Sequence, residues 1–326
     1  MSNLNCYYKF SNSKIDVVSF GEMLVDFISQ KNEVLLSKVE EFTRHFGGSA
    51  ANVTVNLRRL GVKTRLITRI GDDAFGHFLL DVLNKENINT NGIQIDQKRK
   101  TPLVFINKTA GTPAWVAYRA ADKYLEFNEK VEYLIKNAKI LYLTTFIISQ
   151  NPARKVALKI LNMIKENPKK LLAFDPCYRP SLWSDSKMGK SLVKKIIALS
   201  DFIKPSLDDA KIFFGTESPE NYIDKYLQLG ANIVILTMGK DGVLFSDGKT
   251  KIHLPSYADE VVDVTGAGDA FWAGFITAIL DGMSVKKAVE LGNITAVFKI
   301  RGVGALSPIP SKKHLIKFME KQEASQ

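Results

Sequence analysis

The chain has 326 residues, of which 45% are hydrophobic, 24% charged and 10% aromatic, with a net charge of +11. These values fit a globular protein large enough for one α/β unit with an appendage. Its basic residues are scattered, without a basic arm or zinc-finger spacing, and no uncharged apolar run reaches the about 18 residues of a membrane span, so we predict a cytoplasmic protein that binds neither nucleic acid nor membrane.

Short apolar runs rich in β-branched residues alternate with amphipathic segments along most of the chain. The predicted strands are 15–20, 64–70, 139–143, 171–175, 202–204 and 232–237. The predicted helices are 49–60, 74–85, 152–165, 191–199 and 219–229, and the C-terminal third adds 267–281, 285–300 and 312–321. This alternation predicts right-handed βαβ units and an α/β fold with a mainly parallel sheet between helical layers.

Two regions, residues 24–46 and 100–120, interrupt the alternation. Both contain extended stretches without a convincing crossover helix, and 101–107 and 115–118 are predicted strands with a turn at Gly111 and Pro113. We predict that the two regions form one small β lid inserted into a single domain spanning residues 1–326. Because exposed strand edges invite pairing with a second copy, a homodimer through the lid is also expected.

The strongest motif is DVTGAGD at Asp263–Asp269, which precedes an almost wholly apolar run. Gly266, Ala267 and Gly268 are small enough for backbone N–H groups to approach an anion, and the apolar run predicts a buried helix whose N-terminus faces the same space. Such a site would stabilise a phosphoryl group in transfer, with Asp269 as the base for an attacking hydroxyl. The alternative is ordinary capping of a helix by a Gly–Asp pair.

A second motif, GGSAAN at Gly47–Asn52, opens the helix predicted over 49–60. Gly47 and Gly48 would allow a ligand to lie against the backbone, Ser49 is the expected N-cap, and Asn52 offers a donor and an acceptor to a hydroxyl. The alternative is a tight turn from strand to helix. The chain contains no complete P-loop and no dinucleotide-binding glycine motif.

Together the two motifs resemble the signatures of the ribokinase-like, or PfkB, family of carbohydrate kinases. The N-terminal signature also resembles Arg69–Gly76, and the C-terminal signature DTxGAGD differs from this chain only at Val264. The resemblance extends from about Ile15 to Pro310. It implies a ribokinase-like three-layer sandwich, ATP and Mg²⁺ as cofactors, Asp269 as the base, and an anion hole formed by Gly266, Ala267 and Gly268.

The resemblance also implies positions for the nucleotide and the cations. The segment KPSLDD at Lys204–Asp209 is similar to the family's KPNxxE segment, with Asp209 in place of the glutamate near Mg²⁺. Asp263, Thr265 and Arg301–Ser307 resemble segments that hold a monovalent cation such as K⁺ in some members. The residues implied to bind ATP are Lys204, Ser206, Thr237, Gly239, Gly242 and Asn293.

The substrate is predicted from acidic and basic residues near the expected sugar site. Asp26 lies after the first strand and suits a neutral polyol because a carboxylate accepts hydrogen bonds from hydroxyls. The segment Phe174–Trp183 resembles one shared by fructokinases and 2-keto-3-deoxygluconate kinases, with Cys177 in place of asparagine. Arg119 and Arg179 could bind a carboxylate or phosphate, or could brace their loops.

Fructokinase, which converts D-fructose to fructose 6-phosphate, is the first expectation, and Gly47, Gly48 and Asn52 would then contact the sugar. The alternative is 2-keto-3-deoxygluconate kinase, which would bind the acid's carboxylate through the two arginines. A nucleoside kinase would require a different lid chemistry. A non-catalytic sugar-binding regulatory protein could keep the same fold, although the presence of Asp269 disfavours it.

Overall fold

The computed structural model describes residues 4, 7–10, 13–108 and 114–324. Its centre is a nine-stranded sheet in the order β13-β12-β11-β10-β9-β8-β1-β4-β5. The parallel strands are β1 (Ile15–Phe20), β4 (Thr64–Gly71), β5 (Ile93–Asp96), β8 (Ala138–Thr144), β9 (Leu171–Asp175), β10 (Phe202–Ile203) and β11 (Ile233–Thr237). The hairpin of β12 (Val243–Ser246) and β13 (Lys251–Leu254) extends one edge in antiparallel pairing.

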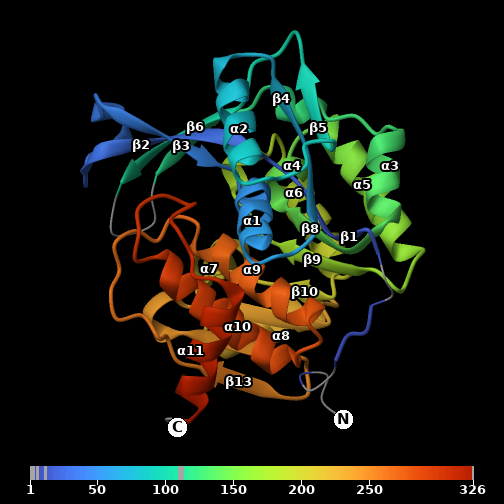
Figure 1. The fold of residues 1–326 in the computed structure, drawn as a ribbon, viewed down its shortest axis with the longest axis vertical. Helices are drawn as coiled ribbons and strands as arrows, with labels where there is room; N and C mark the ends of the chain where they lie inside the picture. Colours follow the sequence, from blue (N-terminus) through green and yellow to red (C-terminus); the bar gives the residue numbers. More distant parts are fainter. Residues whose placement is uncertain (1–3, 5–6, 11–12, 109–113, 325–326) are drawn as a thin grey trace.

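Helices cover both faces of this sheet (Figure 1). One layer contains α1 (Ser49–Arg59), α2 (Ala74–Lys85), α9 (Ala267–Leu280), α10 (Val285–Lys299) and α11 (Lys312–Ala324). The other contains α3 (Glu129–Lys136), α5 (Ala153–Lys165), α6 (Ser186–Ile197), α7 (Leu207–Phe214) and α8 (Pro219–Gln228). Successive side chains of a strand point to opposite faces of the sheet, so Val17 packs against the first layer and Val18 against the second. The predicted three-layer α/β sandwich is confirmed.

Short helices complete the chain: α4 (Thr145–Ile148), η2 (Leu36–Lys38), η3 (Ala121–Tyr124), η4 (Pro180–Leu182) and η5 (Gly239–Asp241). Helix α6 begins five residues before its predicted start at 191, at Ser186. The cause is local: the Asp185 carboxylate accepts the N–H groups of Lys187 and Met188 and so caps an earlier turn. Within the described residues, no helix is both long and apolar enough to cross a bilayer.

A separate four-stranded sheet forms the lid, in the order β3-β2-β6-β7. Its strands are β2 (Leu24–Asn32), β3 (Phe42–Gly47), β6 (Leu103–Lys108) and β7 (Trp115–Tyr118), so both interrupting regions of the sequence contribute to one sheet. The lid projects to the left of the main sheet in Figure 1. The turn predicted at Gly111 and Pro113 lies outside the described residues.

The main sheet changes its direction of winding between β1 and β8, which are parallel neighbours. In open α/β sheets, the carboxyl ends of the strands form a crevice at such a point. Polar residues follow several strands at this edge: Glu22 lies just after β1, Thr144 and Asp175 end β8 and β9, and Lys204 follows β10. The topology therefore places charged side chains from distant parts of the sequence beside one another.

Candidate active site

Helix α9 begins where the sequence predicted an anion hole. Gly266 is its N-cap and has a left-handed φ of 78°, and a Cβ atom there would lie 2.8 Å from the Cα and Cβ atoms of Ala305. Glycine is thus required both for the backbone conformation and for the space. The N–H of Ala267 donates to the Val264 carbonyl at 3.0 Å, which places the amides that follow it at the positive end of the helix dipole.

The ammonium group of Lys204 lies beside this helix start. A Cβ atom on Gly268 would lie 3.2 Å from Lys204 Nζ, and the lysine is only 4% exposed. Lys204 Nζ is 3.5 Å from Asp175 Oδ2, and the same oxygen accepts the indole N–H of Trp272 at 2.9 Å. A fixed positive charge and a helix N-terminus therefore face the same space, as transfer of a phosphoryl group requires.

Asp269 is buried and held by two residues of α1. Ser49 Oγ donates to Asp269 Oδ1, and Asn52 Nδ2 donates to Asp269 Oδ2 at 2.9 Å. Burial raises the pKa of Asp269 to about 6, although these two hydrogen bonds favour the ionised form. The prediction that Ser49 is an N-cap is wrong, because Gly48 occupies that position and the Ser49 hydroxyl is left to orient Asp269.

The two glycines of the GGSAAN motif make room for acidic residues of the protein itself. A Cβ atom on Gly47 would lie 2.1 Å from Asp26 Oδ2, and one on Gly48, whose φ is 97°, would lie 2.5 Å from the Glu22 carbonyl oxygen. Burial, together with the negative charges of Asp269 and Glu22, raises the pKa of Asp26 to about 7. Asp26 and Asp269 are therefore within electrostatic reach of each other.

Glu22 joins three elements across the point where the sheet changes direction. Its Oε1 accepts the backbone N–H of Ser49 at 3.0 Å, and its Oε2 accepts the Thr144 hydroxyl at 2.6 Å. Burial raises the pKa of Glu22 to about 7. Glu22 thus fixes the start of α1 and, through Ser49, the carboxylate of Asp269.

Arg119 is almost fully engaged by the protein. Its guanidinium donates to Asp122, to the Phe146 carbonyl at 3.0 Å and to Ser149 Oγ at 2.7 Å, and it stacks on the Phe146 ring at 3.9 Å. Its Nη2 is buried and has no partner in the described part of the chain. The charge of Arg119 also opposes the rise in the pKa of Glu22, so the guanidinium lies within electrostatic reach of that carboxyl group.

A cavity of about 790 Å³ opens from Asp269 toward α10. The predicted base and anion hole share it with the residues predicted to bind ATP, namely Lys204, Ser206, Thr237, Gly239, Gly242 and Asn293. Apolar residues of β12, of the loop after β13 and of the end of α10 with the residue that follows it line its far end: Val243, Val261, Ala296, Val297 and Ile300. An apolar slot that ends in a cationic, amide-lined corner suits a nucleotide base with its phosphates.

Arg179 and Asp209 form an ion pair on the wall of this cavity. Asp209 Oδ2 also accepts the N–H and hydroxyl groups of Ser206, while the Ser206 hydroxyl accepts the Asp209 N–H, which is a complete capping box at the start of α7. The structure therefore shows Arg179 bracing its loop. From the sequence alone, two roles for Arg179 were open: bracing its loop and binding the substrate.

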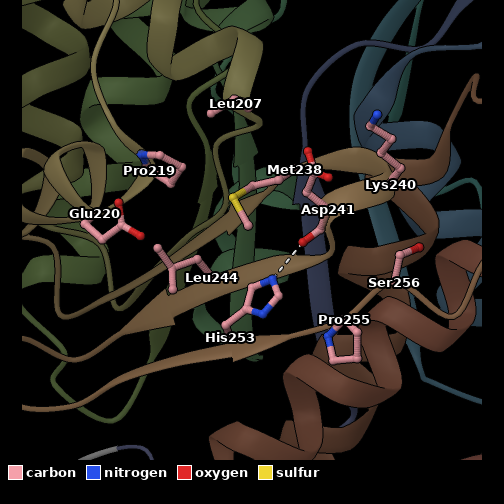
Figure 2. A pocket seen from close by; sticks show the side chains of 10 residues that line it. All are labelled: Leu207, Pro219, Glu220, Met238, Lys240, Asp241, Leu244, His253, Pro255 and Ser256. Carbon is pink, nitrogen blue, oxygen red and sulfur yellow. Dashed lines mark hydrogen bonds between the residues drawn. The ribbon is translucent and has the colours of Figure 1, made fainter.

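A neighbouring hollow of about 550 Å³ lies against the loop that carries Thr237 and Gly242 (Figure 2). It shares Leu207, Met238, Lys240 and Ser256 with the larger cavity but contains none of the predicted catalytic residues. His253 Nε2 forms a hydrogen bond of 2.7 Å with the Asp241 carbonyl across it. This hollow thus lies behind the loop predicted to contact the nucleotide, and His253 supports that loop.

The loop predicted to hold a monovalent cation contacts the start of α9. The Asp263 carboxylate accepts the N–H of Thr265 at 2.9 Å and that of Gly304 at 2.7 Å. Burial alone would raise the pKa of Asp263, but these hydrogen bonds hold it below its ordinary value. Asp263 therefore ties the segment before α9 to the segment after α10.

Comparisons with known proteins agree with this geometry. A model described as "pfkB family carbohydrate kinase" matches residues 14–312. An ATP-dependent 6-phosphofructokinase of Thermoanaerobacterium thermosaccharolyticum is 39% identical over 311 residues, 95% of each chain. A 2-dehydro-3-deoxygluconokinase of Bacillus subtilis is 31% identical, covering 95% of this chain and 97% of its own. The structure of Halothermothrix orenii fructokinase is 48% identical, with a TM-score of 0.78 over 90% of this chain and 100% of that one.

The fold and the site thus define an ATP-dependent sugar kinase with a ribokinase-like architecture. The chain belongs to the PfkB family of carbohydrate kinases. This membership disfavours the non-catalytic alternative.

Proposed function

We propose that the protein phosphorylates D-fructose to fructose 6-phosphate. The observation that carries the proposal is the buried acidic group of Asp26, Glu22 and Asp269 around the start of α1. Carboxylates accept hydrogen bonds from sugar hydroxyls and repel an anionic group beside them, so they favour a neutral polyol. Asn52 supports this choice, because its Oδ1 is buried without a partner in the described residues and can accept a further hydroxyl.

In this proposal Asp269 accepts the proton of the attacking hydroxyl. Gly266, Ala267 and Gly268 present the helix N-terminus to the transferred group, and Lys204 adds its positive charge. Asp26 and Asn52 form the sugar side of the site, and Gly47 and Gly48 leave the room that the Asp26 carboxylate and the Glu22 carbonyl occupy. Ser206, Thr237, Gly239, Gly242 and Asn293, which line the cavity, form the nucleotide side.

Magnesium fits the nucleotide side as a counterion of the ATP phosphates. Asp175 and Asp209 line the cavity there, but among the described residues no group of three or more acidic, histidine or cysteine side chains could hold a metal ion. Mg²⁺ commonly keeps its waters and binds one or two carboxylates together with substrate phosphates, so such a cluster is not needed. When bound, Mg²⁺ would neutralise charge on the phosphates.

Fructose 6-phosphate is a second candidate substrate, on two observations. The relative with 39% identity is a 6-phosphofructokinase, and a hollow of about 380 Å³ under the lid contains Lys108 and His45 beside Asp263. A phosphate at the outer end of the sugar could lie there, away from the buried carboxylates. The acid 2-keto-3-deoxygluconate is supported by Arg119 Nη2, which has no hydrogen-bond partner among the described residues, whereas Arg179 is already paired with Asp209.

The test is ADP release with Mg²⁺–ATP on equal concentrations of fructose, fructose 6-phosphate, 2-keto-3-deoxygluconate and a nucleoside. We expect the highest kcat/KM with fructose. The variant Lys108→Ala should leave fructose turnover unchanged; if fructose 6-phosphate is instead the preferred substrate, it should raise KM for that compound. Preference for the keto acid, lost in Arg119→Lys, would overturn the fructose proposal but retain the kinase.

We also propose that two copies pair through the lid. Strand β7 is an edge strand of the lid, and its Val116 and Tyr118 are 46% and 61% exposed. The Tyr118 ring packs against Phe105, which in turn contacts Phe27 and Phe42. An exposed edge that carries apolar side chains favours pairing with another strand.

A further inference from the structure

A lysine is buried beneath the start of α9. Lys299 is the last residue of α10, its exposed fraction is 0%, and its Nζ donates to the Asp263 carbonyl at 2.9 Å. Lysine is almost never fully buried without a partner. Burial lowers the pKa of Lys299, while the negative charges of Asp263 and Asp269 oppose that change. The ammonium thus lies within electrostatic reach of the proposed base.

The oxygen atoms around this lysine already accept hydrogen bonds. The Lys299 carbonyl accepts the Ser307 hydroxyl at 2.7 Å, and the Ile300 carbonyl accepts the N–H groups of Val262 at 2.8 Å and Asp263 at 3.1 Å. The Asp263 carboxylate is occupied by the N–H groups of Thr265 and Gly304, as described above. The two loops are therefore joined by a closed set of contacts, with the ammonium among them.

This environment does not fit the monovalent cation expected at Asp263 and Thr265. A cation such as K⁺ needs several oxygen atoms that can turn toward it, and here the carbonyl oxygen and both carboxylate oxygens of Asp263 already accept ammonium or N–H groups. A second positive charge beside Lys299 would also be repelled in a poorly solvated interior. The chain thus supplies from α10 the charge that a bound ion would supply.

We propose that the ammonium of Lys299 is a tethered cation that replaces a bound K⁺ beneath the anion hole. It holds the Asp263 carbonyl, which fixes the loop leading into Gly266 and hence the start of α9. That loop also packs closely against Ala305, because a Cβ atom on Gly266 would lie only 2.8 Å from the Ala305 Cα. Lys299 is therefore a positioning residue, and turnover of this kinase should not depend on K⁺.

The first experiment compares ADP release by the wild-type protein in KCl and in choline chloride at equal ionic strength. An activating ligand coupled to a site typically changes its properties by about 5-fold or more. We expect a change of less than about 2-fold, below that coupling range. Activation by K⁺ of about 5-fold or more would overturn the proposal.

The second experiment removes the ammonium. Lys299→Ala leaves both space and oxygen atoms, so KCl but not choline chloride should restore its turnover by about 5-fold or more. Lys299→Met fills the space without charge, and it should lose kcat with little change in KM for ATP and without rescue by K⁺. Lys312→Ala, which removes an exposed lysine paired with Asp281, serves as the control and should match the wild type. Lys299→Met with full activity would contradict the proposal.

A third readout needs no sugar and so separates this inference from the choice of fructose. The midpoint of thermal unfolding is measured in KCl and in choline chloride for the wild type and Lys299→Ala. We expect K⁺ to raise the midpoint of the alanine variant and to leave that of the wild type unchanged, because a ligand stabilises only a folded state that binds it. A K⁺-dependent rise in the wild type would contradict a tethered cation even if the alanine variant failed to fold.

Discussion

At the scale of single residues, the proposed chemistry depends on the carboxylate of Asp269. The change Asp269→Asn keeps the shape of the side chain but removes its ability to take a proton. General base catalysis typically contributes about 10²–10⁴-fold, so we expect kcat to fall by that factor. Calorimetric titration should show that ATP still binds. A variant that kept more than a tenth of the wild-type kcat would show that Asp269 is not the base.

The hydrogen bond from Ser49 should be visible in the pH dependence of the reaction. Asp269 must be ionised to accept a proton, so its pKa of about 6 predicts that kcat falls as the pH drops through 6. Ser49→Ala removes a donor that stabilises the ionised form, which raises the pKa and moves this acidic limb to higher pH. Thr54→Ala is the control, since the Thr54 hydroxyl bonds only within α1 to the Ala50 carbonyl among the described contacts. If the acidic limb of the kcat profile lay at the same pH in both variants, the role of Ser49 would be contradicted.

The site was only partly predictable from single residues. Asp269, Asn52 and the nucleotide-side residues stand in recognisable motifs, and the structure brings them around one cavity and its sugar side. Glu22, Thr144 and Asp175 were not singled out, because their importance comes from sheet order rather than from neighbours in the sequence. The available signal was a polar residue at the carboxyl end of each buried strand. Lys299 gave no such signal, since a lysine near a helix end is normally exposed.

At the scale of elements, the start of α9 can be tested with two glycines of similar conformation. Gly266 and Gly282 flank the helix, with φ values of 78° and 75°, but only Gly266 has neighbours where a Cβ would lie. Gly282→Ala should cost about 1–2 kcal/mol from its backbone conformation alone and leave kcat unchanged. Gly266→Ala should lower both stability and kcat, because it also pushes Ala305 away from the helix start. Urea denaturation and ADP release measure the two effects, and equal behaviour of the variants would show that the contact is unimportant.

The periodicity of apolar residues in the sequence predicted helices and strands correctly where these elements were long. Strand β9 and helix α2 have the predicted bounds, because a buried apolar run and a capped amphipathic pattern define them. Strands β5, β12 and β13 and helices α3 and α7 were not predicted. Strand β13 is largely exposed, so its sequence carries no buried run, and α7 depends on the capping box of Ser206 and Asp209, whose segment was interpreted only as a nucleotide site.

At the scale of the whole molecule, the lid is built by pairing that no local pattern could specify. Strand β2 lies parallel to β6, with Asp26 opposite Val104, across almost eighty residues of chain. The sequence predicted that the two regions form a lid, but not its strand order or register, because register is set by contacts between distant segments.

The proposed dimer can be tested on the edge strand of this lid. Tyr118→Lys places a charge on the exposed aromatic side, and charges on an edge strand oppose pairing. We expect light scattering after size exclusion to give twice the chain mass for the wild type and the chain mass for the variant. Tyr133→Lys, a change at an exposed tyrosine of α3, should leave the mass unchanged. A wild-type protein that elutes as a monomer at all concentrations would exclude the dimer.

The two hydrogen bonds that hold Asp269 also bear on how ATP is protected when sugar is scarce. Both carboxylate oxygens of Asp269 accept bonds from α1, through Ser49 and Asn52. A water molecule that enters the site therefore competes with two donors already in place for the only proposed proton acceptor. A sugar brings several hydroxyls and can replace those bonds while it reacts. We therefore expect this arrangement to discourage hydrolysis of the nucleotide by water and to reserve its energy for the sugar.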